Sequence, residues 1–150
     1  MKPTLFAGAL TICLVAVAPS TSAFPGKLSK HCNLQEGFVI YDAGTIKKEI
    51  AQFAGVFDGK WAGKLDNTLI VWEVDKTGKA SGFYAWGKYR KWGINSAGCT
   101  GFVGQIADGK LKFELRNGAK VTYWFESAKK IKATYVHRGR TTSATLKRKR

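Results

Sequence analysis

The chain has 150 residues, of which 45% are hydrophobic and 23% charged, and its 25 Lys and Arg against 10 Asp and Glu give a net charge of +15. This size suits a single domain. The whole chain holds two histidines and three cysteines, and neither histidine has a metal-ligand spacing, so the composition argues against a metal centre.

The amino terminus has the organisation of a secretory signal peptide. Lys2 supplies a positive charge, residues 5–18 form an apolar run, and small or polar residues continue to Ala23. We expect cleavage after Ala23, with Ala18 as a second candidate. The apolar run is shorter than the roughly 20 residues that a transmembrane helix needs. The sequence therefore predicts a secreted or periplasmic protein whose signal peptide is residues 1–23.

The next segment, residues 24–44, is predicted to be irregular, because proline and glycine interrupt it around one apolar run. Once Cys13 is removed with the signal peptide, Cys32 and Cys99 remain. Two cysteines in an exported chain favour one disulfide, which here would join this segment to a mid-chain loop. Two free thiols are the alternative.

A folded domain is expected over residues 45–150, ending in a basic carboxyl tail. Ile46, Ile50 and Phe53 recur at helical spacing, which predicts one short amphipathic helix that ends near Gly55. Beyond it the period changes to two, which indicates strands. The predicted strands are residues 56–65, 69–75, 80–87, 102–107, 110–116, 119–126, 129–137 and 141–148, with a long loop at 88–101.

Nearly all of these strands are joined by tight turns. Asp108-Gly109 and Asn117-Gly118 are strong hairpin signals. A run of hairpins indicates a meander, and a meander of this length can close on itself and so remove its exposed edges. The fold class predicted is therefore all-β: an antiparallel up-and-down barrel of about eight strands, preceded by one short helix. A two-sheet sandwich is the alternative.

The motif Gly59-Lys60-Trp61 on the first strand, after a short helical segment and before a meander, resembles the start of a lipocalin or avidin-like (calycin) barrel. In lipocalins an arginine of the last strand packs over that tryptophan, so the resemblance implies this role for Arg140 or Arg148. Closed barrels of the avidin type associate through their outer walls, which leaves the oligomeric state open.

A second resemblance concerns residues 57–63 together with the run Tyr84-Ala85-Trp86-Gly87. The two stretches are similar to small modules in exported bacterial proteins that have no settled activity.

No catalytic signature is present in the sequence. It has no Gly-x-Ser-x-Gly motif and no phosphate-binding glycine loop. Asp66, Asp75 and Asp108 fall at turns, where aspartate caps the backbone. Glu73 is the carboxylate placed to enter a pocket, and a single acid does not form a catalytic pair. We therefore predict a non-enzymatic protein without a cofactor, a metal or catalytic residues; an enzyme with an unrecognised site is the alternative.

The aromatic residues admit two interpretations. Rings on both faces of one strand, as in Tyr84-Ala85-Trp86, are explained by packing inside and outside a small barrel. The functional interpretation is a ligand platform on the long loop, whose flat rings suit sugars or planar ligands and whose basic residues favour an anionic group. The residues predicted for this site are Trp86, Tyr89, Arg90, Lys91 and Trp92, with Cys99 holding the loop.

Clusters of basic residues, of which residues 147–150 are one, predict an anionic partner and strong salt dependence. For an exported protein the expected partners are an anionic glycan, a glycolipid, an acidic protein or the surface of a membrane; nucleic acid is less favoured. The first hypothesis is a binding module that acts through an aromatic, basic barrel mouth. The alternative is a protein-interaction module, such as an inhibitor of an envelope or host enzyme.

Overall fold

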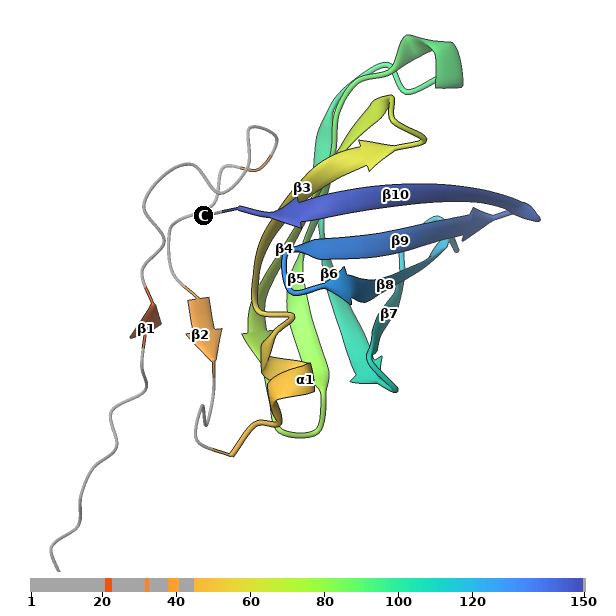
Figure 1. The fold of residues 1–150 in the computed structure, drawn as a ribbon. Coiled ribbons are helices and arrows are strands. Elements are labelled where there is room, and N and C mark those ends of the chain that lie inside the picture. Colours follow the sequence, from red (N-terminus) through yellow and green to blue (C-terminus); the bar gives the residue numbers. More distant parts are fainter. Residues whose placement is uncertain (1–20, 23–31, 33–37, 41–44, 150) are drawn as a thin grey trace, which may run out of the picture.

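The computed structural model describes residues 21–22, 32, 38–40 and 45–149 of the chain (Figure 1). These residues form ten strands, one α-helix and one 3₁₀-helix: β1 (Thr21–Ser22), β2 (Phe38–Ile40), α1 (Lys48–Ala51), β3 (Gly55–Trp61), β4 (Leu65–Val74), β5 (Lys79–Trp86), η1 (Arg90–Trp92), β6 (Gly98–Ala107), β7 (Lys110–Glu114), β8 (Lys120–Ser127), β9 (Lys130–His137) and β10 (Arg140–Arg148). The predicted long loop is shortened to residues 87–97, because β6 begins at Gly98.

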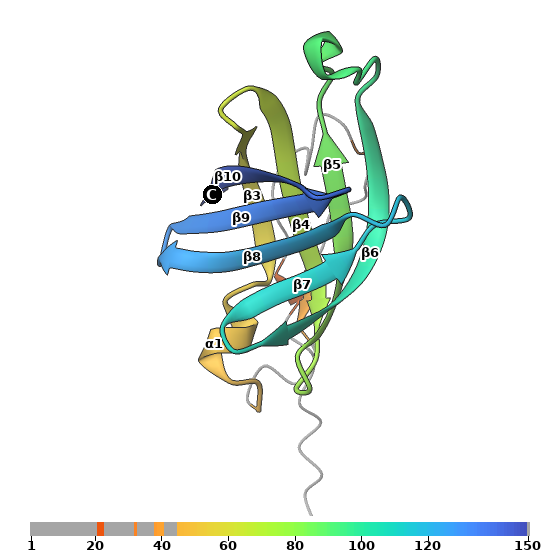
Figure 2. The same ribbon diagram turned by 90° about the vertical axis from the view of Figure 1, so that its right-hand side faces the viewer.

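Strands β3 to β10 form one closed antiparallel sheet. Each strand pairs with the next in chain order, and β10 pairs with β3 from Ala144↔Trp61 to Arg148↔Phe57. Strands β7–β10 cross β3–β6 steeply, so the sheet wraps around one core (Figure 2). The structure confirms the predicted eight-stranded up-and-down barrel with one short helix before it, and it excludes the two-sheet sandwich. This layout is consistent with a calycin-like fold.

The alternation of side chains along each strand fills the barrel. On β3, Phe57 and Trp61 are buried and point inward, whereas Lys60 between them is exposed. Rings from neighbouring strands meet in this core, and the ring centroids of Phe102 and Phe113 are only 4.0 Å apart in a stacked arrangement. The alternation of residues with a period of two in the sequence therefore predicted correctly which side chains face the core and which face outward.

Turn residues set the register of the hairpins. Asp108 and Gly109 have φ values of 50° and 69°, the left-handed conformation that a two-residue hairpin turn requires. Asn117 and Gly118 belong to the longer connection 115–119, where the Asn117 side chain accepts the backbone N–H of Ala119. Both predicted turns are therefore confirmed as hairpin connections.

One end of the barrel is closed by the helical segment. Helix α1 spans only Lys48–Ala51. It is therefore shorter than the helix that the spacing of apolar residues predicted. Beyond it Phe53 is fully buried, and its ring centroid lies 4.9 Å from that of Phe125. The segment therefore acts as a plug that inserts a ring into this end of the core.

Arg148 fastens this plug to the last strand. Its guanidinium lies 4.6 Å from the centre of the Phe57 ring and donates hydrogen bonds to the carbonyl oxygens of Ala54, at 2.9 Å, and of Gln52. Gly55, with φ of 143°, leaves the room for this contact, because a Cβ there would collide with the guanidinium. Burial lowers the pKa of Arg148, yet an arginine keeps its charge in a protein.

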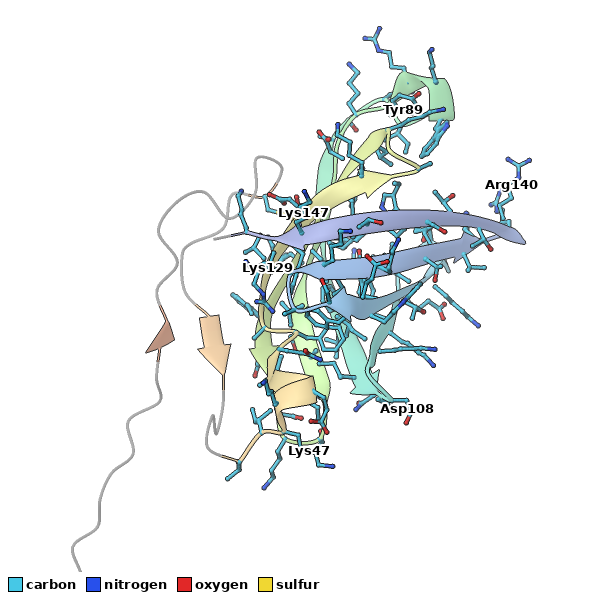
Figure 3. The ribbon with its side chains drawn as sticks, in the orientation of Figure 1. Lys47, Tyr89, Asp108, Lys129, Arg140 and Lys147 are labelled. Atoms are coloured by element: carbon cyan, nitrogen blue, oxygen red, sulfur yellow. A yellow bond between two sulfur atoms is a disulfide. The ribbon has the colours of Figure 1, made fainter. Side chains whose placement is uncertain are left out.

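The arginine contact implied at Trp61 is wrong. Arg148 pairs in register with Phe57, which lies four residues before Trp61 on β3, and it covers that ring instead. Arg140 is exposed at the far end of β10 (Figure 3).

A second, smaller apolar cluster lies on the outer wall. Cys32 and Cys99 form a disulfide with their Cα atoms 5.6 Å apart, as predicted. Cys32 packs there against the outward-facing side chains of Val56, Ile70 and Ala85. The disulfide therefore attaches the amino-terminal segment to the start of β6.

The predicted signal peptide, residues 1–23, and the segment 24–44 lie largely outside the described residues, and both stay predictions. Within them, β1 pairs with β2, and β2 runs parallel to the end of β4 at Val39↔Glu73. In the described part of the chain, no helix is long and apolar enough to cross a membrane.

We predict that replacing Arg148 with Met lowers the free energy of unfolding by about 2 kcal/mol, because two charge-assisted hydrogen bonds are lost. Urea denaturation measures the change. Lys147→Met, on the exposed face of the same strand, is the matched control and should change stability by less than about 0.5 kcal/mol. Equal effects of the two substitutions would contradict the role given to Arg148.

The disulfide yields a second prediction for stability. It spans 67 residues of sequence, so removing it in a Cys32→Ser, Cys99→Ser variant should lower the free energy of unfolding by up to about 4 kcal/mol. Reduced wild-type protein should match the variant in urea denaturation. A reduced wild type as stable as the oxidised form would show that the cross-link does not stabilise the fold.

Candidate ligand-binding cavity at the open end of the barrel

An up-and-down barrel places alternate connections at opposite ends. Here the connections 62–64, 87–97, 115–119 and 138–139 lie at one end, which we call the open end. Helix α1 and the connections 75–78, 108–109 and 128–129 lie at the other. Figure 3 shows Tyr89 and Arg140 on the side of the open end, away from Lys47 and Asp108.

A cavity of about 490 Å³ occupies the open end. Its walls come from six strands, from η1 and from two connections, and most of the side chains that form them are aromatic or apolar. The residues that line it are Trp61, Leu65, Tyr84, Trp86, Trp92, Ile94, Thr100, Leu115, Arg116, Asn117, Tyr135 and Thr142. This volume falls in the range that holds small organic ligands.

The floor of the cavity is a pair of hydrogen-bonded rings. The indole N–H of Trp61 donates to the hydroxyl oxygen of Tyr84 at 2.9 Å. Burial raises the pKa of Tyr84, and it raises the pKa of Tyr123 well above the usual value. Both phenols are therefore neutral at physiological pH, and Tyr84 with Trp61 forms the base of the cavity.

A polar group lies close to this floor. Asn67 is 1% exposed, and its amide donates to the hydroxyl of Tyr123 at 3.4 Å. Its side-chain oxygen has no hydrogen-bond partner within the part of the chain described. A buried amide oxygen of this kind needs a hydrogen-bond donor for full stability.

Trp86 and Trp92 form the aromatic wall. The Trp86 indole packs flat against β6, where a Cβ on Gly98 would collide with it. Trp92 is carried by η1 and remains 42% exposed, and its ring lies edge-to-face with Tyr89 at 5.1 Å. The sequence places glycine at position 98 because no other side chain leaves room for the indole.

The five residues of the predicted platform fall into two groups. Trp86 and Trp92 line the cavity. Tyr89 supports Trp92, whereas Arg90 and Lys91 are exposed on η1 outside the lining. Their role as ligand-binding residues stays a prediction.

Several lining residues were missed by the sequence analysis. Arg116 and Asn117 lie in the connection 115–119, and Asn117 donates to the hydroxyl of Tyr135 at 3.0 Å. Counting strands would have placed this connection at the same end as the long loop. Tyr84 and Trp86, two residues apart, could likewise have been assigned to one inward face.

The charged residues in the connections at the open end are all basic. The four connections there contain six Lys and Arg residues and no Asp or Glu: Lys64, Lys88, Arg90, Lys91, Arg116 and Arg138. The three connections at the other end contain two Asp and two Lys. Arg116 is the charged side chain that lines the cavity itself. The open end therefore attracts anions.

A second hollow, of about 920 Å³, lies on the outer wall beside Trp124. Two of the lysines around it are already paired: Lys60 lies 2.9 Å from Asp66, and Lys132 lies 3.4 Å from Glu126. This more open surface therefore offers less free charge than the open end.

Among the described residues, no group of three or more His, Cys, Asp and Glu side chains is placed to hold a metal ion. No protein-family model matches the chain, and no curated protein is significantly similar to it in sequence. The cavity has flat apolar walls, a hydrogen-bonded floor and a cationic rim, which are compatible with a binding module.

The buried phenols yield a prediction for alkaline pH. Unfolded tyrosines lose their protons near pH 10, whereas Tyr84 and Tyr123 keep theirs to higher pH. The stability that their burial supplies is therefore complete below about pH 10 and falls as the pH rises above it. Urea unfolding at about pH 8 and about pH 11, with ultraviolet absorbance of tyrosinate, measures this. Tyr84→Phe should weaken the pH dependence; an unchanged dependence would contradict the assignment.

Proposed function

We propose that this protein is an exported, non-enzymatic binding module that holds a small anionic ligand with a flat apolar body at the open end of its barrel. The observation that carries the proposal is an aromatic cavity of about 490 Å³ at an end of the barrel whose four connections contain six basic residues and no Asp or Glu. The walls suit the apolar body, and the rim suits the charge.

The energetics favour moderate affinity. Burying roughly 200 Å² of an aromatic ligand contributes roughly 5 kcal/mol, from which the cost of immobilising the ligand is subtracted. Arg116 adds a charge-assisted, planar contact for a carboxylate, sulfate or phosphate. Affinities of about millimolar strength follow, with association accelerated by the cationic rim.

The compartment decides which natural ligands the cavity meets. A disulfide persists in oxidising surroundings, which supports the expectation of a secreted or periplasmic protein. Anionic glycans and glycolipids are present there, and sugar faces stack on exposed indoles such as Trp92, which is 42% exposed. Both ligand classes combine an apolar face with the negative charge that the rim attracts.

Three ligands with one aromatic body and different charges test the proposal. By isothermal titration calorimetry, 2-naphthoate should bind most tightly, 2-naphthamide more weakly, and 2-naphthylmethylammonium weakest, because only the anion is attracted by the rim. Added salt should weaken naphthoate binding in part, since the contacts to the rings are not screened. Absence of saturable naphthoate binding would overturn the proposal.

Matched substitutions locate the binding. Trp92→Ala should weaken naphthoate about tenfold through loss of a ring contact, whereas Trp72→Ala should not, although Trp72 is 43% exposed on the outer wall. Arg116→Gln should weaken naphthoate and leave naphthamide unchanged. Lys110→Gln, at the opposite end, is its control. If a substitution in the cavity and its control change the naphthoate affinity equally, the ligand is not in the cavity.

A further inference from the structure

Over much of its length, strand β6 pairs with a described strand along just one of its two edges. Its ladder with β5 runs from Lys79↔Gln105 to Trp86↔Gly98. Its ladder with β7 has just three pairs, at residues 105–107 of β6. Figure 2 shows the upper part of β6 continuing beside β5 and past β7. Among the described residues, the stretch 98–104 therefore has a strand neighbour on one side alone.

The main-chain groups on this free edge can be identified. Ile106 donates its N–H to the carbonyl oxygen of Gly78, at 2.7 Å, and so faces the side of β5. Main-chain N–H and C=O groups alternate between the two sides of a strand. The N–H and C=O groups that point toward the free side are therefore those of Cys99, Gly101 and Val103. In the described structure, the carbonyl of Gly101 receives only a 3.5 Å contact from the Thr100 hydroxyl.

The free edge borders the cavity. The side chain of Thr100 lines the cavity from β6, and Leu115 and Arg116 line it from the connection 115–119 across the gap. A strand laid along the edge would place every second side chain inward, toward the aromatic wall.

We propose that an acidic segment of a partner protein binds here in extended conformation, as an added strand on the free edge of β6 at residues 99–103. The inference rests on the proposed function, since the segment occupies the same cavity and meets the same cationic rim. It adds an acidic peptide segment to the ligand classes that the cavity binds.

Two features of the edge favour this occupant. A peptide backbone carries alternating donors and acceptors at the spacing of the edge, which is how strands are added to exposed sheets. The six basic residues of the connections at the open end are complementary to aspartate and glutamate. A second copy of this chain, with its net charge of +15, would bring like charges together at the open end.

The experiment uses an acetylated and amidated octapeptide of alternating Glu and Val, with calorimetry on the oxidised protein. Two N-methylated isomers of this peptide are compared. The first carries an N-methyl group on every Glu, and the second carries one on every Val. Alternate residues of a strand face opposite sides, so one isomer loses the hydrogen bonds to β6 and should bind about tenfold or more weakly than the other. Equal binding by both isomers would overturn strand addition.

A variant of the protein gives an independent test. Gly101→Pro removes an N–H from the free edge while leaving the ladder with β5 intact, and it should abolish discrimination between the isomers. Gly101→Ala is the matched control, because a Cβ there would lie no closer than 3.8 Å to its neighbours. If Gly101→Pro does not fold, the N-methyl isomers still decide the question on the wild type.

Binding of 2-naphthoate separates the two proposals. Naphthoate binding together with equal affinity for the two isomers overturns strand addition and leaves the small-ligand function standing. Failure of naphthoate as well overturns both. Light scattering tests the other occupant: a dimer that the peptide cannot dissociate would assign the edge to a second copy of the chain and overturn the acidic partner.

Discussion

The contact of Arg148 with the segment before β3 determines which end of this barrel can receive a ligand. The carbonyl oxygens of Gln52 and Ala54 follow a helix of four residues and need donors that the helix cannot supply. The guanidinium supplies them and covers Phe57 at the same time. Because this fixes Phe53 in the core, the end of the barrel beside α1 is filled, whereas the aromatic cavity lies at the open end.

Above the filled part, hydrogen bonds between rings replace simple apolar packing. Trp61 would bury an unsatisfied N–H if Tyr84 did not accept it, and Tyr123 plays a similar part for Asn67. Such polar pairs hold the rings in fixed positions, so the floor of the cavity cannot collapse into the space above it. A preformed cavity binds ligands without the cost of ordering its walls.

Much of the fold was predictable because it depends on local rules. The period of two assigned strand faces, and Asp108-Gly109 fixed a hairpin through the backbone conformation that those residues allow. The cavity was only partly predictable, because Arg116 approaches Trp86 through the closure of the sheet and not through sequence proximity. Arg148 was assigned to the wrong ring because the β3–β10 register, which decides the pairing, leaves no signature in the sequence.

The same closure explains why, among the described residues, β6 has an edge without a strand partner at the open end. Strands β7–β10 cross β3–β6 steeply, so β6 and β7 remain adjacent for only three pairs before they separate. An exposed edge invites association, and proteins usually protect it with charge or cover it. Here the cationic connections at the open end repel another copy of the chain and attract acidic chains. If the partner is acidic, as we propose, one arrangement of charge both limits self-association and selects that partner.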